Sequence, residues 1–335
     1  MSVNTTFPAL LEAFFTERLV QQKHASAHTL ASYRDTFCLL LRYAEQTLNK
    51  APSRLALEDL DAPLIAAFLD YLQESRGTSA RSRNVRLAAI HSFFRYAALQ
   101  APDHSSLIEQ VLAIPSKRFE RSPIAYLTQL EIEALLAVPN LATWLGRRDR
   151  TLLLVALQTG LRVSELTALR WQDVSLVTGA YVCCQGKGRK NRCTPLRKDA
   201  NTALRAWRRE QPQDPLAPVF PTTRGTTLSR DGVAYIVAKY LARAREQCPS
   251  LEGKRVSPHV LRHSAAMTLL HSGVDCAVIA LWLGHESMET TQIYLHASLE
   301  LKQQALDKTT PYGANIRTNR MILLPGNITD NLFEQ

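Results

Sequence analysis

Six residues beyond position 160 have side chains that suit phosphate chemistry. They are two arginines, two histidines, a lysine and a tyrosine: Arg162, Lys187, His259, Arg262, His285 and Tyr294. Arginines can neutralise the oxygens of a phosphodiester as charge develops on them in the transition state. An unassisted tyrosine has a pKa of about 10 and needs a neighbouring base or cations to become a nucleophile. The set therefore suits cleavage of a phosphodiester by a tyrosine.

Two of these residues lie at glycine turns. Arg162 follows a Gly-Leu turn in TGLRVSEL, where its guanidinium could present a bidentate fork to a phosphate. The alternative for Arg162 is a salt bridge with Glu165, and we expect Ser164 to cap the helix that follows. Lys187 lies between two glycines and could donate a proton to a leaving oxygen. Its alternative is an ordinary exposed lysine in a turn.

The remaining residues belong to helices expected nearer the C-terminus. His259 and Arg262 are three residues apart, so they project side by side from one helix. The neighbouring His263 is expected to face elsewhere and to be structural. His285 directly follows a glycine that stops a helix, and Tyr294 comes nine residues later. Considered by itself, Tyr294 would be interpreted as a packed aromatic.

The order and surroundings of these residues resemble the tyrosine recombinase, or phage integrase, family. That family has the signature Arg, Lys, His-x-x-Arg, His, Tyr. The segments TGLRVSEL, GKGRKNRCTPL, SPHVLRHSAA and LGHESMETTQIY match it as well. The strong part of the resemblance covers about residues 124–308, and no catalytic position departs from the pattern. The helical N-terminal part resembles the family's SAM-like core-binding domain.

The resemblance implies a mechanism. Tyr294 would attack the scissile phosphate of DNA, leaving a 3′-phosphotyrosine and a free 5′-hydroxyl. Lys187 would be the general acid for the 5′-oxygen, and His259 would serve Tyr294 as base and later as acid. The two arginines and His285 would hold the phosphate. Because the protein–DNA ester stores the bond energy, the resemblance implies no cofactor, neither a metal nor ATP.

The resemblance also implies partners and a role. Two domains would clamp double-stranded DNA, and four protomers would exchange strands through a Holliday junction, a partner recombinase being a further option. A helix near 299–308 would dock onto a neighbouring protomer. The C-terminal extension favours integration, excision or transposition of a mobile element, and the alternative is resolution of chromosome or plasmid dimers. A catalytically silent DNA-binding accessory protein and a type IB topoisomerase are alternatives of other classes.

The charge balance agrees with a polyanionic partner. Forty Lys+Arg against thirty Asp+Glu give a formal net charge of +10, which favours nucleic acid or an acidic membrane surface. Two basic runs, within 76–95 and 186–209, contain the residues expected to contact DNA. These are Arg81, Arg83, Arg86, Arg189, Lys190 and Arg192. The alternative for the first run is a solvated cationic face.

The apolar periodicity predicts a mainly α-helical protein of two domains. Residues 1–115 are expected to form a helical core-binding domain, with helices over 7–19, 30–48, 63–72 and 79–99. On the last helix, Val85, Ala88, Ala89, Phe93 and Tyr96 form the expected apolar side. Residues 116–126 are predicted to be an exposed linker. Residues 127–310 would be the catalytic domain, with one β-hairpin over 180–196, and 311–335 a tail.

Other features exclude some classes of site and location. No apolar run is long enough to cross a bilayer, and no secretory signal peptide is evident. No set of Asp and Glu residues suggests a two-metal nuclease. The cysteines show neither metal-ligand spacing nor a disulfide framework, so free thiols and a reducing cytoplasm are expected. They are Cys38, Cys183, Cys184, Cys193, Cys248 and Cys276.

Overall fold

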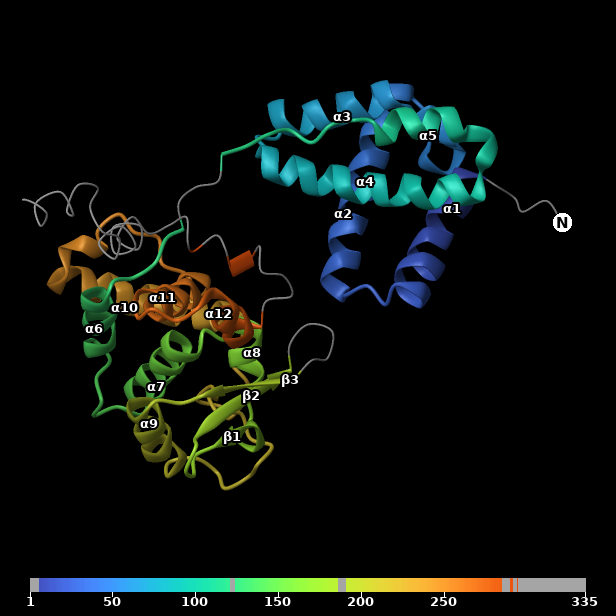
Figure 1. Ribbon diagram of the computed structural model, residues 1–335. Coiled ribbons are helices and arrows are strands. Elements are labelled where there is room, and N and C mark those ends of the chain that lie inside the picture. Colours follow the sequence, from blue (N-terminus) through green and yellow to red (C-terminus); the bar gives the residue numbers. More distant parts are fainter. Residues whose placement is uncertain (1–5, 121–123, 186–190, 285–289, 292–293, 295–335) are drawn as a thin grey trace, which may run out of the picture. The chain divides into compact units, whose positions relative to one another are not determined.

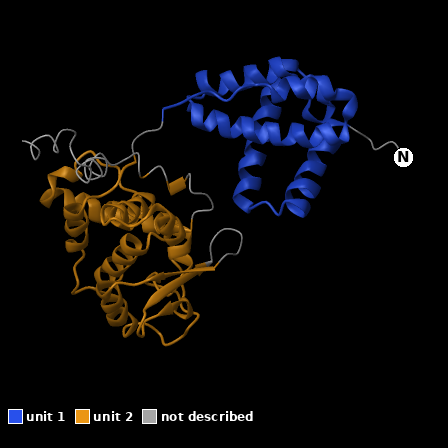
Figure 2. Ribbon diagram, in the orientation of Figure 1, with its two compact units in different colours: residues 1–121 blue, residues 122–335 orange. Residues whose placement is uncertain are grey.

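A computed structural model describes residues 6–120, 124–185, 191–284, 290–291 and 294. The chain divides into two compact units, residues 1–121 and residues 122–335, shown in separate colours in Figure 2. Each unit has its own buried apolar core. The division after Arg121 falls inside the segment 116–126 that the sequence assigns to a linker.

The described residues of unit 1 form helices joined by short connections (Figure 1). Side-chain oxygens of Ser26, Asp61 and Ser79 accept hydrogen bonds from backbone N–H groups and so begin the longer helices. The elements are α1 (Phe7–Ala13), the π-helical η1 (Phe14–Gln22), α2 (Ala27–Leu48), α3 (Ala62–Glu74), α4 (Ala80–Gln100) and α5 (Ser105–Leu112), with 3₁₀ turns η2 (Pro52–Arg54), η3 (Leu57–Leu60) and η4 (Pro102–His104).

The buried side of α4 agrees with the predicted one in part, because Ala89, Phe93 and Tyr96 are buried as predicted. Leu87, Ile90, Phe94 and Ala97 are buried at alternating spacings of three and four residues, and the same stripe begins at the buried Arg83. Val85 and Ala88, by contrast, are exposed. Assigning Val85 and Ala88 to the apolar side was therefore wrong, because a few small or branched apolar residues do not define the stripe uniquely.

The segment predicted as an exposed linker is held at both ends. On the unit 1 side, the backbone N–H of Lys117 donates to Asn84, and its ammonium lies 3.0 Å from Asp70. On the unit 2 side, the backbone N–H of Leu127 donates to Ser264 Oγ, 2.8 Å away. Tyr126 packs against the small core of unit 2 next to α11. Residues 116–120 and Ala125 are exposed, as predicted, whereas Tyr126 is half-buried.

Unit 2 is a set of helices with one small sheet (Figure 1). Its central helix, α7, is buried over most of its length and packs against α6, α9 and α11. The strands follow the antiparallel order β1-β2-β3, and β2 and β3 are the predicted hairpin. The helices are α6 (Gln129–Ala137), α7 (Trp144–Thr159), α8 (Val163–Ala168), α9 (Lys198–Arg208), α10 (Arg230–Gln247), α11 (Pro258–His271) and α12 (Cys276–Leu283); the strands are β1 (Val174–Ser175), β2 (Tyr181–Gln185) and β3 (Asn191–Pro195); the 3₁₀ turns are η5 (Trp171–Asp173) and η7 (Pro249–Leu251).

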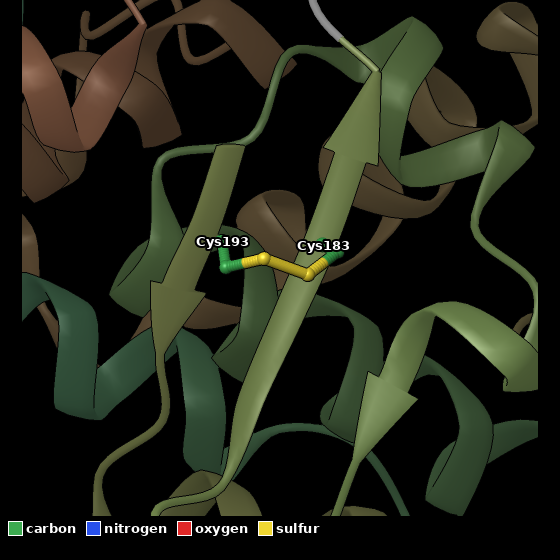
Figure 3. The surroundings of a disulfide bond; sticks show 2 residues. All are labelled: Cys183 and Cys193. Carbon is green, nitrogen blue, oxygen red and sulfur yellow. A yellow bond between two sulfur atoms is a disulfide. The ribbon is translucent and has the colours of Figure 1, made fainter. Parts of the chain in front are cut away.

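Strands β2 and β3 are joined by a disulfide. Cys183 lies directly opposite Cys193 in the antiparallel register, and a Cys183–Cys193 bond links them (Figure 3). The expectation of six free thiols was wrong for this pair. A separation of ten residues has no meaning as a disulfide pattern until the register of the hairpin is known. Cys38, Cys184, Cys248 and Cys276 are free thiols in the structure.

No helix in the described ranges is both long and apolar enough to cross a membrane.

Candidate active site

Two helix ends in unit 2 approach each other through glycines. Gly160 ends α7 and Gly284 ends α12, both in the left-handed region, with φ of +62° and +65°. A Cβ on Gly160 would lie 2.6 Å from Cδ2 of Leu283, and one on Gly284 would lie 2.7 Å from Nη1 of Arg192. Both positions therefore need glycine for its backbone conformation and for its lack of a side chain.

Two of the predicted arginines donate to these helix ends. Nη2 of Arg162 lies 3.0 Å from the Gly284 carbonyl oxygen. Arg262 donates from Nη1 to the Gly160 oxygen, at 2.6 Å, and from Nη2 to the Leu283 oxygen, at 2.7 Å. The last carbonyls of a helix lack intrahelical partners and carry partial negative charge, so cations are stabilised there. The structure thus gathers Arg162 and Arg262 at the end of α12.

A buried carboxylate links Arg162 to β3. Glu165 accepts from the backbone N–H and Nη1 of Arg162, at 2.7 and 2.9 Å, and from both terminal nitrogens of Arg192, at 2.9 and 2.7 Å. Burial alone would raise the pKa of Glu165, but these charged hydrogen bonds outweigh it and lower the pKa. The expected salt bridge of Arg162 with Glu165 is present. Glu165, rather than Ser164, caps α8.

Positive charge exceeds negative charge around this carboxylate. Burial, and then the nearby guanidinium of Arg162, lower the pKa of Arg262 to about 10. Arg262 therefore stays protonated at neutral pH, although its side chain is almost wholly buried. The three guanidinium groups of Arg162, Arg192 and Arg262 are thus charged in the presence of one carboxylate. Such a surplus of fixed cations favours an anion as ligand.

Arg192 is paired with Glu165 in the structure. Its side chain is 12% exposed, and both terminal nitrogens are bound to Glu165. In this structure the guanidinium of Arg192 is bound to Glu165, and its contact with DNA stays a prediction. The basic run showed the charge of this residue, but the acid that binds it lies 27 positions earlier in the chain.

On α11, two histidines lead from the surface towards Tyr294. His259 is exposed, and its ring centroid lies 4.3 Å from that of the half-buried His263. Nδ1 of His263 lies 3.0 Å from Oη of Tyr294, which is 1% exposed. The prediction that His263 faces elsewhere was wrong. The sequence held the signal, because residues four apart on a helix share one face, as His259 and His263 do.

Burial shifts the pKa values of this pair in directions that keep the proton on the phenol. Burial, and then electrostatic repulsion from the neighbouring His259 and Arg262, lower the pKa of His263 to about 4. Burial raises the pKa of Tyr294, against the smaller opposite effect of Arg262. A neutral imidazole thus faces a protonated phenol, and the hydroxyl of Tyr294 donates to Nδ1 of His263 in the tautomer that carries its proton on Nε2.

Several predicted residues remain as predictions. Lys187, Arg189, Lys190 and His285 lie outside the described residues. In the parts of the chain that the structure describes, no group of three or more His, Cys, Asp or Glu side chains could hold a metal ion. Arg81 is exposed on α4, so its side chain is accessible to a ligand.

The other two arginines predicted to bind DNA from α4 point into unit 1. Arg83 is 4% exposed and donates to the Pro115 carbonyl, 3.3 Å away. Arg86 is half-buried and donates to the Ser32 carbonyl and to the Thr36 hydroxyl on α2. Their shared helical face was predicted correctly, but it is the inward face. Both side chains are thus bound within unit 1, and their contact with DNA stays a prediction.

Comparison with known proteins identifies the family. Residues 125–300 match the phage integrase family, and residues 13–101 match the N-terminal SAM-like domain of phage integrases. The chain belongs to the phage integrase family. It is thus a tyrosine-type site-specific recombinase, as the order of Arg162, His259, Arg262 and Tyr294 predicted.

Relatives within this family cover most of the chain. A putative integrase/recombinase, y4rC of Sinorhizobium fredii, is 56% identical over 93% of this chain and 94% of its own length. The tyrosine recombinase XerC of Xanthomonas axonopodis pv. citri is 33% identical over 89% of this chain and 95% of its own. Among solved structures, the XerH recombinase bound to its difH substrate superposes with a TM-score of 0.69, at 21% identity, over 85% of this chain and 81% of that chain. The last similarity supports the two-domain phage integrase fold.

Proposed function

We propose that this protein cleaves and rejoins double-stranded DNA at specific sites, with Tyr294 as the nucleophile. The observation that carries the proposal is the convergence of Arg162 and Arg262 on consecutive carbonyls, Gly284 and Leu283, at one helix end. A scissile phosphate beside these two cations would be neutralised as it gains charge. Support for Tyr294 at the same place comes from its packing in one small core with Leu283, whose carbonyl accepts from Arg262.

The remaining roles follow the family pattern. Lys187 would protonate the departing 5′-oxygen, His259 would exchange a proton with Tyr294, and His285 would help to hold the phosphate. His285 follows Gly284 directly in the sequence, which supports its assignment to the same site. The surplus of basic residues supports DNA as the partner. We further propose that four protomers act together on two DNA duplexes in the cytoplasm.

For the biological role we propose integration, excision or transposition of a mobile element. This is supported by the putative integrase/recombinase of S. fredii, which is 56% identical to this chain. Resolution of chromosome or plasmid dimers is the second candidate, supported by the more distant XerC relative at 33% identity. A plasmid that carries the DNA flanking the gene would distinguish them: excised circles with joined ends indicate movement, whereas resolution of plasmid dimers alone indicates the second role.

The chemistry is tested with a nicked suicide substrate made from the flanking DNA, in EDTA. The wild-type protein is expected to form a denaturant-resistant adduct with DNA, and Tyr294→Phe is expected to form none. The adduct peptide identified by mass spectrometry should carry Tyr294. Tight binding to the substrate without any adduct would favour a catalytically silent accessory protein and would overturn the assignment of the nucleophile.

A further inference from the structure

The proposed nucleophile is buried in the resting protein. Tyr294 is 1% exposed and lies in a small core with Met267 of α11 and with Ile279 and Leu283 of α12. A phosphate of a DNA duplex cannot reach a hydroxyl in that position. Whatever binds the hydroxyl in this place therefore influences how readily the tyrosine becomes available.

His263 makes a hydrogen bond with the Tyr294 hydroxyl. Nδ1 of His263 lies 3.0 Å from Oη of Tyr294, and the two ring centroids are 5.5 Å apart at an interplanar angle of 65°. The His263 ring also contacts the exposed ring of His259, with the centroids 4.3 Å apart. His263 therefore has a fixed position between the surface and the buried phenol.

We propose that His263 is a positioning residue that holds Tyr294 in this resting place, and that the phenol must leave His263 before it attacks DNA. The inference rests on the proposed function, because it takes Tyr294 as the nucleophile. His263 acts through Tyr294 and does not itself touch the phosphate. The lowered pKa of His263 supports this, because a neutral ring can accept the hydrogen bond throughout the neutral range.

Three substitutions separate the hydrogen bond from the shape of the ring. His263→Phe keeps a ring and removes the acceptor. His263→Asn retains a polar atom close to the position of Nδ1, and His263→Gln places its amide one carbon further from the backbone. His271→Phe is the matched control, because His271 lies on the same helix but its ring packs against Tyr126. Circular dichroism and thermal unfolding identify the variants that fold.

Two measurements report on Tyr294 independently. The first is nitration by tetranitromethane without DNA, quantified by mass spectrometry in the peptide that contains Tyr294. The second is the single-turnover rate of adduct formation on the nicked suicide substrate. Loss of one net hydrogen bond corresponds to about a fivefold change in an equilibrium. We expect both nitration and the adduct rate to rise about fivefold in His263→Phe and His263→Gln. In His263→Asn and in the control His271→Phe, both nitration and the adduct rate should equal those of the wild type.

Other outcomes overturn the inference. Unchanged nitration in His263→Phe and His263→Gln would mean that the hydrogen bond does not hold Tyr294. An adduct rate that falls a hundredfold while nitration stays unchanged would make His263 a proton acceptor in the reaction instead. Failure of the proposed function gives a different result, since the wild-type protein would then form no adduct whatever the nitration shows.

Discussion

The arginines of the two units differ in what they face. In unit 1, Arg83 and Arg86 donate to neutral acceptors, namely two carbonyls and a threonine hydroxyl. In unit 2, Arg162 and Arg192 share the buried carboxylate of Glu165, and Arg262 lies among helix-end carbonyls near them. Arg83 and Arg86 each bind separate neutral acceptors inside their own unit. The three arginines of unit 2, by contrast, surround a single carboxylate and so leave an excess of positive charge at one place.

The difference shows that the residue type does not decide the role of an arginine. A guanidinium buried against neutral acceptors contributes to packing, because its five donors join segments that would otherwise leave carbonyls unpaired. Several guanidinium groups around one carboxylate are in addition a site for a second anion. The comparison can be tested by removing members of each group separately.

The largest expected effect is the fall in the rate of DNA cleavage when Arg162 is replaced. Arg162→Ala should lower the single-turnover rate of adduct formation by about two to three orders of magnitude, the usual cost of losing one donor to a developing oxyanion. Arg83→Met, its counterpart in unit 1, should change this rate less than threefold at saturating protein. Equal losses in the two variants would abolish the distinction between the units.

The second-largest expected effect is a loss of stability when the shared carboxylate of Glu165 is removed. Glu165→Gln leaves Arg192 unpaired in a site where it is only 12% exposed. We expect the free energy of unfolding to fall by about 3 kcal/mol in urea titrations at pH 7. Asp199→Asn is the matched control, because Asp199 pairs with an arginine at the surface and should contribute less than about 1 kcal/mol.

The same carboxylate predicts a pH dependence. The pKa of Glu165 is lowered in the folded protein from a reference value of 4.5. Its contribution to stability is therefore complete above about pH 4.5 and is lost as the pH falls through the lower folded pKa. The unfolding free energy of the wild type should decrease with acidification in that window more steeply than that of Glu165→Gln. Parallel curves for the two proteins would contradict the lowered pKa.

The disulfide tests whether the cluster in unit 2 depends on the β2–β3 hairpin. Cys193 directly follows Arg192, so the bond to Cys183 restrains the strand that brings Arg192 to Glu165. Under oxidising conditions, Cys193→Ser should lower the unfolding free energy by about 2–3 kcal/mol, the value expected for closing a short loop. With dithiothreitol, the wild type should match the variant. In a cytoplasm that keeps thiols reduced, the wild-type protein would have Cys183 and Cys193 as free thiols.

The smallest expected effect is a change in the salt dependence of DNA binding, which should differ between Arg81 and Arg83 on α4. Arg81 is exposed on α4, whereas Arg83 is buried. If Arg81 contacts a phosphate, Arg81→Ala should lower the slope of log affinity against log salt by about 0.9 without loss of stability. Arg83→Met should leave that slope unchanged and reduce stability by about 1 kcal/mol. A reversed pattern would show that Arg83 turns outward when DNA binds.

The sequence predicted well the features set by local rules. The helix predicted over 79–99 begins at the capping residue Ser79, and the hairpin predicted over 180–196 has the expected strands. The family was identified from short segments around catalytic positions, because these residue types and their order are rare outside it. The helices α5 and α9 were missed, since each spans only two or three turns and repeats its apolar residues too few times to define a period.

The features that depend on packing between distant segments could not be predicted. Arg83 and Arg192 read as surface charges until the structure showed Pro115 and Glu165 beside them. The disulfide required the register of two strands. His263 could have been placed in part, because its four-residue spacing from His259 indicates a shared helical face. Only its contact with Tyr294 required knowledge of the fold.

The long separation between contacting residues constrains the order in which the protein folds during synthesis. Arg162 binds a carbonyl 122 residues later in the chain, and Arg262 binds one 102 residues earlier. Closing such long loops is slow and unfavourable until the distant segment is present. Unit 1 has its own core within the first 121 residues and can fold as it leaves the ribosome. The cluster of Arg162 and Arg262 can assemble only after α12 has been synthesised. A chain that ends before α12 would therefore contain a folded unit 1 but no assembled active site.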